Sequence, residues 1–211
     1  MTISTKPAII FDFGGVLLDW NPRNLFQKYF GEDTDAMEKF LREIDFFSWN
    51  LEQDKGRSFA EGVAELSARF PQYAYLIKAH DERREESIHG PIQSTVDALM
   101  PLKEKGHPLY GLTNWSEEKF RLVAHKYDFF NLFETILVSG SVRLVKPDPR
   151  IFQMMLDEIG RPASECVLID DSATNTMAAR QLGFKAIHYE SSGQMLEELA
   201  QLEIVCQQPG L

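Results

Sequence analysis

Five short apolar runs alternate with amphipathic segments along most of the chain. The first is Ala8-Ile9-Ile10-Phe11, and the others cover residues 109–112, 135–138, 166–169 and 186–189. Unbroken apolar runs of this length, rich in β-branched residues, are typical of strands that are buried on both faces. The segments between the later runs carry apolar residues at helical spacing. Strands that alternate with helices predict an α/β fold with a doubly wound parallel sheet.

The stretch between the first two apolar runs has a different pattern. Leu25, Phe26 and Tyr29 fall at helical spacing, and the rest of residues 23–88 shows almost none of the pattern typical of strands. Ser58 and Glu61 have the spacing of a capping box, which predicts the start of a helix. We therefore expect a core over residues 1–19 and 89–211, interrupted by a helical insert over residues 20–88.

The composition of the chain limits its partners. Among 211 residues, 44% are hydrophobic and 26% are charged, which is enough for one domain with an insert. The formal net charge of −10 would repel nucleic acid, whereas a local site can still bind a small anionic substrate. We therefore expect no nucleic-acid partner. Nothing in the sequence pattern indicates an oligomeric state.

The sequence shows neither a signal peptide nor a membrane span. Residues 1–7 contain no apolar core segment, and no run approaches the ~20 apolar residues that cross a bilayer. Cys166 and Cys206 have no His or Cys at metal-ligand spacing, so we expect inert packing residues in a reducing compartment. These features predict a cytoplasmic protein without a membrane partner. Surface positions are predicted for four histidines, His80, His89, His107 and His125.

Polar residues follow four of the predicted strands. Asp12 ends the first, Thr113 ends the second, a loop leading to Lys146 follows the third, and Asp170 and Asp171 end the fourth. Because parallel strands present their carboxyl ends at one edge of the sheet, these groups should converge where open α/β sheets bind ligands. Three clustered carboxylates repel one another unless a cation neutralises them. Mg²⁺, which prefers oxygen ligands, is the expected cation.

Asp12 is the best candidate for a nucleophile in this set. Gly14 and Gly15 allow the backbone behind it to turn tightly and to approach a ligand. Thr113 and Lys146 supply a hydrogen-bond donor and a positive charge for an anionic group, and carboxylate nucleophiles serve in phosphoryl transfer. Alternatively, Asp170 and Asp171 only cap the helix that follows them.

Four motifs in this order resemble those of the haloacid dehalogenase-like (HAD) hydrolase superfamily. They are Asp12-Phe13-Gly14-Gly15-Val16, Leu112-Thr113-Asn114, Lys146-Pro147 and Ile169-Asp170-Asp171. The insert resembles the small α-helical (C1-type) cap of that superfamily, so the resemblance implies a Rossmann-like catalytic core with a cap that sets specificity.

The resemblance also implies a role for each motif residue. Asp12 would be the nucleophile, and Thr113 and Lys146 would assist catalysis. Thr113, Asn114 and Lys146 would bind the transferred group, with Lys146 also restraining Asp12. A Mg²⁺ ion would be held by Asp12, the carbonyl of Gly14 and Asp171, with Asp170 in support.

Gly14 departs from the pattern of HAD phosphatases. Those enzymes usually carry a second Asp at this position, which protonates the leaving group and then activates water. General acid–base catalysis is typically worth ~10²–10⁴-fold in rate. The departure predicts a preference for leaving groups that need little protonation. A Cβ introduced at Gly14 is expected to strain the turn.

Three functions are compatible with these residues. The favoured one is a Mg²⁺-dependent phosphatase of a small phosphorylated metabolite, such as a sugar phosphate. A 2-haloacid dehalogenase would use Asp12 without a metal, but Asp171 disfavours it, because the fourth motif of dehalogenases is rich in Ser and Asn. The third is a binding module that has lost catalysis.

Several other side chains are candidates for the pocket. Trp115 either lines the pocket or packs under the cap, and Asn175 could support Asp170. A dehalogenase would need an arginine for the substrate carboxylate, and the candidates in the insert are Arg23, Arg42 and Arg57.

Overall fold

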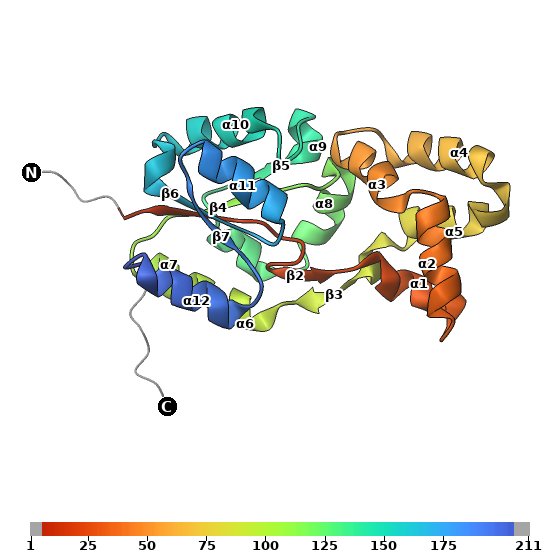
Figure 1. Cartoon of the computed structure of the whole chain (residues 1–211), viewed down its shortest axis with the longest axis horizontal. Coiled ribbons are helices and arrows are strands. Elements are labelled where there is room, and N and C mark those ends of the chain that lie inside the picture. The colour runs from red at the N-terminus through yellow and green to blue at the C-terminus, as the bar shows by residue number, and fades with distance from the viewer. Residues whose placement is uncertain (1–5, 205–211) are drawn as a thin grey trace, which may run out of the picture.

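A five-stranded parallel sheet forms the core of the larger part of the molecule (Figure 1). The computed structural model describes residues 6–204. The strands follow the order β5-β4-β1-β6-β7 across the sheet. Their bounds are Ala8–Phe11 (β1), Leu109–Thr113 (β4), Thr135–Val138 (β5), Cys166–Asp170 (β6) and Lys185–His188 (β7). This sheet confirms the predicted α/β fold, and each strand coincides with an apolar run to within one residue at either end.

Strand β1 lies in the middle of the sheet, and the later strands are added first on one side of it and then on the other. β4 and β5 extend from one side of it and β6 and β7 from the other, with Ile9 opposite both Leu109 and Val167. Open α/β sheets bind ligands outside the carboxyl ends of their strands at such a switch point. The residues that follow β1, β4 and β6 therefore meet at one place.

Helices cover both faces of the sheet. One face packs against α7 (Leu99–Glu104), α8 (Glu117–Ala124) and α12 (Ser192–Gln201), and the other against α10 (Pro149–Ile159) and α11 (Ala173–Gln181). The short helices α6 (Gln93–Val96) and α9 (Ser139–Val142) lie in the connections. In β1, Ile9 and Phe11 pack into one apolar cluster and Ala8 and Ile10 into the other, which explains why the run is apolar throughout.

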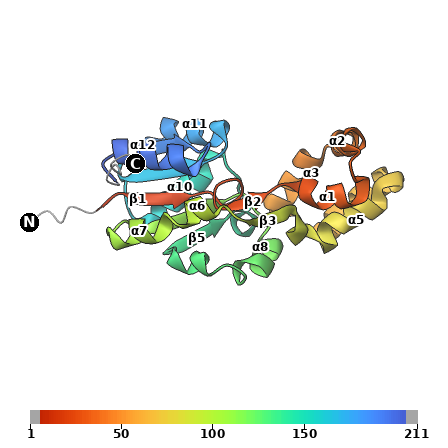
Figure 2. The same ribbon diagram turned by 90° about the horizontal axis from the view of Figure 1, so that it is seen from below.

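Five helices form a separate bundle, which we call the cap. They are α1 (Pro22–Phe30), α2 (Thr34–Glu43), α3 (Phe46–Asp54), α4 (Phe59–Arg69) and α5 (Ala74–Glu82). Their buried side chains form an apolar cluster of their own that includes Phe26, Phe40 and Phe46. The predicted capping box is present, because Ser58 and Glu61 exchange hydrogen bonds at the start of α4. The cap lies beyond the carboxyl end of β1 in both views (Figures 1 and 2).

A two-stranded antiparallel ribbon connects the cap to the sheet. It consists of β2 (Leu18–Trp20) and β3 (Ile88–Pro91), with Trp20 opposite Ile88. The sequence analysis missed this ribbon because its strands are very short and because Gly90-Pro91 is typical of a turn. Their stability comes from pairing between segments far apart in the chain. The remaining regular segments are short 3-10 helices at Pro71–Tyr73, Arg84–Ser87, Asp128–Leu132 and Ala163–Glu165.

Two of the four predicted surface histidines are buried. His80 is 0% exposed and His107 is 2% exposed, whereas His89 and His125 are exposed as predicted. The prediction fails for His80 and His107 because each ring has a buried partner that no sequence pattern indicates: Arg84 for His80, and the carbonyl of Pro7 for His107.

Only one of the two cysteines lies within the described residues. Cys166 is buried in β6, and Cys206 lies outside the described residues. Between residues 6 and 204, no helix is both long enough and apolar enough to cross a membrane.

Candidate active site

Asp12 occupies the first position after β1, at the switch point of the sheet. Its backbone N–H donates to the carbonyl of Ile169 at 2.9 Å, which continues the pairing with β6 by one residue. Its Oδ1 accepts a hydrogen bond from the backbone N–H of Phe13 at 2.7 Å. Asp12 is 8% exposed and lines a cavity, so its carboxylate is fixed in position and still accessible.

Lys146 joins the ends of three strands from a buried position. Its ammonium group donates to Oδ2 of Asp12 at 2.9 Å, to Oδ2 of Asp170 at 2.7 Å and to the carbonyl of Leu112 at 2.7 Å. Burial alone would lower the pKa of Lys146, but the two carboxylates outweigh it and raise this pKa. All three donors of the ammonium group are engaged. In this arrangement Lys146 orients Asp12 and supplies charge.

Asn114 holds the loop that carries Lys146. Its Nδ2 donates to the carbonyl of Lys146 at 2.9 Å, and its Oδ1 accepts from the backbone N–H of Lys146 at 2.8 Å. The side chain of Asn114 thus positions Lys146, whereas the sequence analysis assigned it to substrate binding. Thr113, the last residue of β4, is 1% exposed and lines the cavity beside Asp12.

Three carboxylates converge at the ends of β1 and β6. Asp12, Asp170 and Asp171 each offer an oxygen within 4.8 Å of the others. Asp170 is fully buried, and its oxygens accept hydrogen bonds from Lys146, from the backbone of Ser172 and from Asn175. Asp171 is exposed and lines the cavity. Asp171 is therefore better placed than Asp170 to contact a bound ion directly.

The carboxylate cluster holds more negative charge than Lys146 can neutralise. Burial raises the pKa of Asp12 to about 7, and Asp170 and Asp171 add to this rise while Lys146 opposes it. Burial and the charge of Asp170 also raise the pKa of Asp171. A divalent cation bound between the carboxylates would reverse these shifts, because it favours their ionised forms.

The side chain of Asp171 lies against the backbone of Gly15, where it has space only because glycine has no side chain. Gly15 has a φ of +76°, and a Cβ at this position would lie 2.2 Å from Oδ2 of Asp171. Asp12 and Asp171 both line the cavity, and their carboxylate oxygens are ligands that a hard cation prefers. The residues present therefore fit Mg²⁺.

Gly14, unlike Gly15, has space for a side chain. Its φ lies outside the left-handed region, and the nearest atom to a Cβ at this position would be Cβ of Trp20 at 3.9 Å. The expectation that a side chain at Gly14 would strain the turn is therefore wrong.

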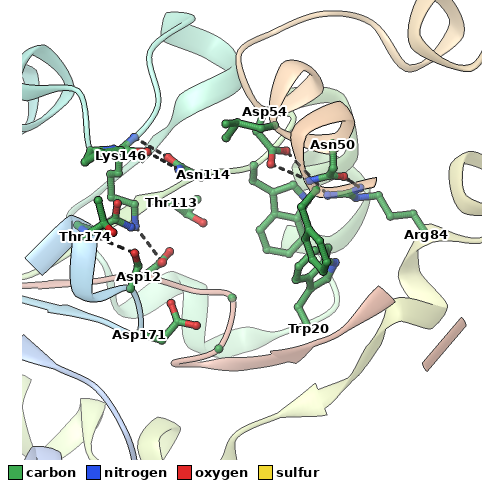
Figure 3. A pocket seen from close by; sticks show the side chains of 18 residues that line it. Asp12, Trp20, Asn50, Asp54, Arg84, Thr113, Asn114, Lys146, Asp171 and Thr174 are labelled. Atoms are coloured by element: carbon green, nitrogen blue, oxygen red, sulfur yellow. Dashed lines mark hydrogen bonds and ion pairs between the residues drawn. The ribbon is translucent and has the colours of Figure 1, made fainter. Parts of the chain in front are cut away.

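The strand ends and the cap enclose a cavity of about 530 Å³ (Figure 3). Asp12, Thr113, Lys146 and Asp171 line its sheet side. Trp115, which follows β4, also lines it, in keeping with one of its two predicted positions. The opposite side consists of residues from the ribbon and the cap, namely Trp20, Phe47, Asn50, Leu51, Asp54 and Arg84.

The sequence analysis missed the polar residues on the cap side. Asp54 ends α3, and Arg84 lies in a charged stretch that reads as a solvated surface, yet they are only 5% and 7% exposed. The predicted candidates Arg23, Arg42 and Arg57 are absent from the residues that line the cavity. Arg23 pairs instead with Glu38, and Arg57 with Glu65. Only the packing of the cap reveals which arginine is buried.

A family model described as haloacid dehalogenase-like hydrolase matches residues 6–183 of the chain. The chain belongs to this family. It is thus a HAD hydrolase, and the predicted resemblance is confirmed. Members of this family that resemble it include both phosphatases and dehalogenases.

Two relatives illustrate this range. The HAD hydrolase is 27% identical over 209 residues to the sesquiterpene phosphatase astK of Aspergillus oryzae, covering 94% of this chain and 97% of that protein. It is 26% identical over 111 residues to an (S)-2-haloacid dehalogenase of a Pseudomonas species, covering 53% of this chain and 48% of that protein. Other curated relatives are much longer, and the chain spans 36% and 38% of two of them.

A solved structure supports the fold. The HAD family enzyme bt-2542 of Bacteroides thetaiotaomicron, in a magnesium complex, superimposes with a TM-score of 0.72. The two chains are 22% identical, and the match covers 93% of this chain and 99% of that one.

The carboxyl of Asp54 should make the stability of the protein depend on pH. Burial raises its pKa from 3.8 to about 7, although Arg84 and the backbone of Ser116 lower it. Folding then takes up a proton between about pH 4 and pH 7, so stability falls as the pH rises through this window. Asn at this position has no such proton. We expect Asp54→Asn to become more stable relative to the wild type between pH 5 and pH 8, by about 2–3 kcal/mol.

Thermal unfolding of both proteins, followed by circular dichroism at several pH values, measures this difference. Glu52→Gln, an exposed change on the same helix, serves as the control and should follow the wild type at every pH. Parallel curves for Asp54→Asn and the wild type would contradict the raised pKa.

Proposed function

We propose that this HAD hydrolase is a Mg²⁺-dependent phosphatase that hydrolyses a small phosphorylated metabolite through an aspartyl-phosphate intermediate. The observation that carries the proposal is the cluster of Asp12, Asp170 and Asp171, whose oxygens lie within 4.8 Å of one another. A divalent cation at this cluster, together with Lys146, would neutralise the three carboxylates and would present a positive centre beside Asp12. Such a centre favours a dianionic phosphate over a neutral ester.

In the proposed reaction, a carboxylate oxygen of Asp12 attacks phosphorus and forms an O–P bond. The bond between phosphorus and the ester oxygen breaks, and its electron pair leaves with that oxygen. Water then attacks phosphorus, the O–P bond to Asp12 breaks, and its electron pair returns to the carboxylate. One proton of this water is lost to solvent, which supplies the proton that the released alcohol takes up, and inorganic phosphate leaves. Lys146 holds Oδ2 of Asp12 at 2.9 Å and keeps the carboxylate aligned during both steps.

Three residues would hold the ion, namely Asp12, Gly14 through its carbonyl, and Asp171. Bound there, Mg²⁺ would supply positive charge that stabilises the negative charge developing on the transferred phosphoryl oxygens. Thr113 lines the same cavity and would donate its hydroxyl to this group. Asp170 would act through its hydrogen bonds to Lys146 and Asn175.

The alternative is a 2-haloacid dehalogenase. Gly14 is compatible with it, because a halide ion leaves without a proton, and one relative with that name matches about half of the chain. Two observations favour the phosphatase. Asp171 places a second carboxylate beside the nucleophile, which would repel the carboxylate of a haloacid. The only arginine among the residues that line the cavity is Arg84, which lies 3.9 Å from Asp54.

We expect Asp12→Asn to lower the rate of phosphate release by at least about 10³-fold, because an amide cannot act as the nucleophile. Phosphate release from p-nitrophenyl phosphate measures the effect. Asp19→Asn, an exposed change in the adjacent ribbon, should retain activity. Retained activity in a folded Asp12→Asn protein would exclude the covalent mechanism, and a wild type no faster than this variant would indicate a binding module.

Removal of Mg²⁺ by EDTA should abolish activity, and re-addition should restore it. Asp171→Ala should weaken Mg²⁺ binding, measured by calorimetry on the unliganded protein, because it removes one of two accessible carboxylates. Asp157→Ala, an exposed acid on α10, is the matched control. Metal-independent release of chloride from 2-chloropropionate would instead assign the protein to the dehalogenases.

Without an acid at Gly14, the rate should depend steeply on the acidity of the leaving group. We expect kcat/KM to rise along a series of alkyl, sugar 1-phosphate and aryl phosphate esters as the leaving oxygen becomes a better anion. Gly14→Asp should flatten this dependence, with the largest gain, up to ~10²–10⁴-fold, for alkyl esters. The nearest atom to the new Cβ is 3.9 Å away, so the variant should fold normally. A flat dependence in the wild type would mean that another group supplies the proton.

A further inference from the structure

Of the three clustered carboxylates, that of Asp171 is held least by its own hydrogen bonds. Asp12 and Asp170 both accept hydrogen bonds from Lys146. Asp171 is exposed, and no side chain among residues 6–204 donates a hydrogen bond to its carboxylate. Its position in the cluster therefore depends on the backbone that carries it.

The peptide group between Asp171 and Ser172 is hydrogen-bonded at both of its polar atoms. Its N–H, which belongs to Ser172, donates to Oδ1 of Asp170 at 2.9 Å. Its carbonyl, which belongs to Asp171, lies 2.9 Å from Nε2 of His188. A carbonyl can only accept, so Nε2 carries the proton in this contact. Because a peptide group is planar, bonds to both of its polar atoms fix its orientation and restrict the backbone of Asp171.

The backbone of His188 is itself fixed by the sheet and by the helix that follows it. In the pairing of β6 with β7, His188 lies opposite Asp170, and the next residue, Tyr189, donates its N–H to the carbonyl of Asp170 at 2.9 Å. Gln194, in the first turn of α12, donates to the carbonyl of His188 at 3.0 Å. The half-buried ring of His188 therefore presents its N–H from a rigid position.

The site leaves Asp171 little freedom to move. Its Oδ2 occupies the space that a Cβ on Gly15 would need, so a shift of its backbone would push the carboxylate into Gly15 or away from Asp12. Mg²⁺ demands nearly ideal octahedral geometry with short bonds to oxygen. A small displacement of Asp171 would therefore weaken the binding of the ion.

We propose that His188 is a positioning residue for Asp171: its Nε2–H holds the carbonyl of Asp171 and thereby keeps the carboxylate in the orientation that binds Mg²⁺. This inference rests on the Mg²⁺ site of the proposed function, and it assigns to His188 no contact with the ion. His188 lies beyond residues 6–183, the part of the chain that the family model matches.

Three substitutions of His188 separate the hydrogen bond from the other properties of the ring. The amide N–H of Gln is as many bonds from Cα as Nε2 of histidine, so His188→Gln can keep the contact. His188→Asn carries the same amide on a side chain one methylene shorter, and His188→Leu has no donor. His89→Leu, a change at an exposed histidine of β3, is the control.

Calorimetry of Mg²⁺ binding to the unliganded protein is the first measurement. Residues that orient metal ligands typically contribute ~10–100-fold to affinity, so His188→Leu and His188→Asn should bind Mg²⁺ ~10-fold more weakly than the wild type. His188→Gln and His89→Leu should stay within ~2-fold of it. Wild-type affinity in His188→Asn, or a loss in His188→Gln as large as in His188→Asn, would overturn the role of the hydrogen bond. This comparison between two amides remains decisive even if the leucine variant does not fold.

The dependence of the rate on Mg²⁺ distinguishes positioning from a merely structural role. With p-nitrophenyl phosphate, His188→Asn should raise the Mg²⁺ concentration for half-maximal rate ~10-fold and leave the rate at saturating Mg²⁺ within ~2-fold of the wild type. An equal fall in rate at every Mg²⁺ concentration would indicate a structural role and would overturn the inference.

Hydrogen exchange in the metal-free protein gives a readout that needs neither ion nor turnover. The backbone N–H of Ser172 belongs to the peptide group that His188 holds, so NMR should show it exchanging ~5-fold faster in His188→Asn than in His188→Gln. Equal exchange in the two variants would overturn the inference. Failure of the proposed function has a different signature: the wild type releases phosphate from no ester, whereas the differences in Mg²⁺ affinity and in exchange persist. A wild type that binds no Mg²⁺ would overturn both.

Discussion

The buried ammonium group of Lys146 is the interaction on which the rest of the site depends. It donates to one carboxylate after β1, to one at the end of β6 and to a carbonyl of β4. Without it, Asp12 and Asp170 would be two buried carboxylates in close contact, an arrangement that costs several kcal/mol when both are ionised. With it, three strand ends are held together, and one oxygen of Asp12 is fixed. Asn114 and Asn175 extend this arrangement by orienting Lys146 and Asp170 respectively.

The two walls of the cavity have different physical origins. The sheet wall consists of strand ends, whose positions are fixed by the pairing of β1 with β4 and β6. The cap wall consists of α3 and the segment after α5, and its polar residues hold one another in place through Asn50 and His80. Ser139 links the two walls, because its hydroxyl donates to the carbonyl of Asp54 at 2.6 Å.

The sequence predicts the sheet wall of the cavity better than the cap wall, because the two walls differ in origin. The ends of parallel strands share one edge, so the positions of Asp12, Thr113, Lys146, Asp170 and Asp171 in the chain already indicate that they converge. A buried strand also has a strong local signature. Arg84 and His80 carry no such signature, because charged and polar residues at helical spacing are usually exposed. Their burial depends on contacts between cap helices far apart in the chain. The amide of Asn114 likewise has a partner, the backbone of Lys146, that only the folded chain reveals.

The ribbon of β2 and β3 brings together the points where the chain leaves the sheet domain and returns to it. Leu18 pairs with Pro91, so the two crossings are neighbours in space. A change in the length of the segment between them would therefore not by itself move the strands that carry Asp12, Asp170 and Asp171. Trp20 lies within this ribbon and also lines the cavity. If the segment between β2 and β3 were replaced, Trp20 would stay with the sheet and would still form part of the cavity wall.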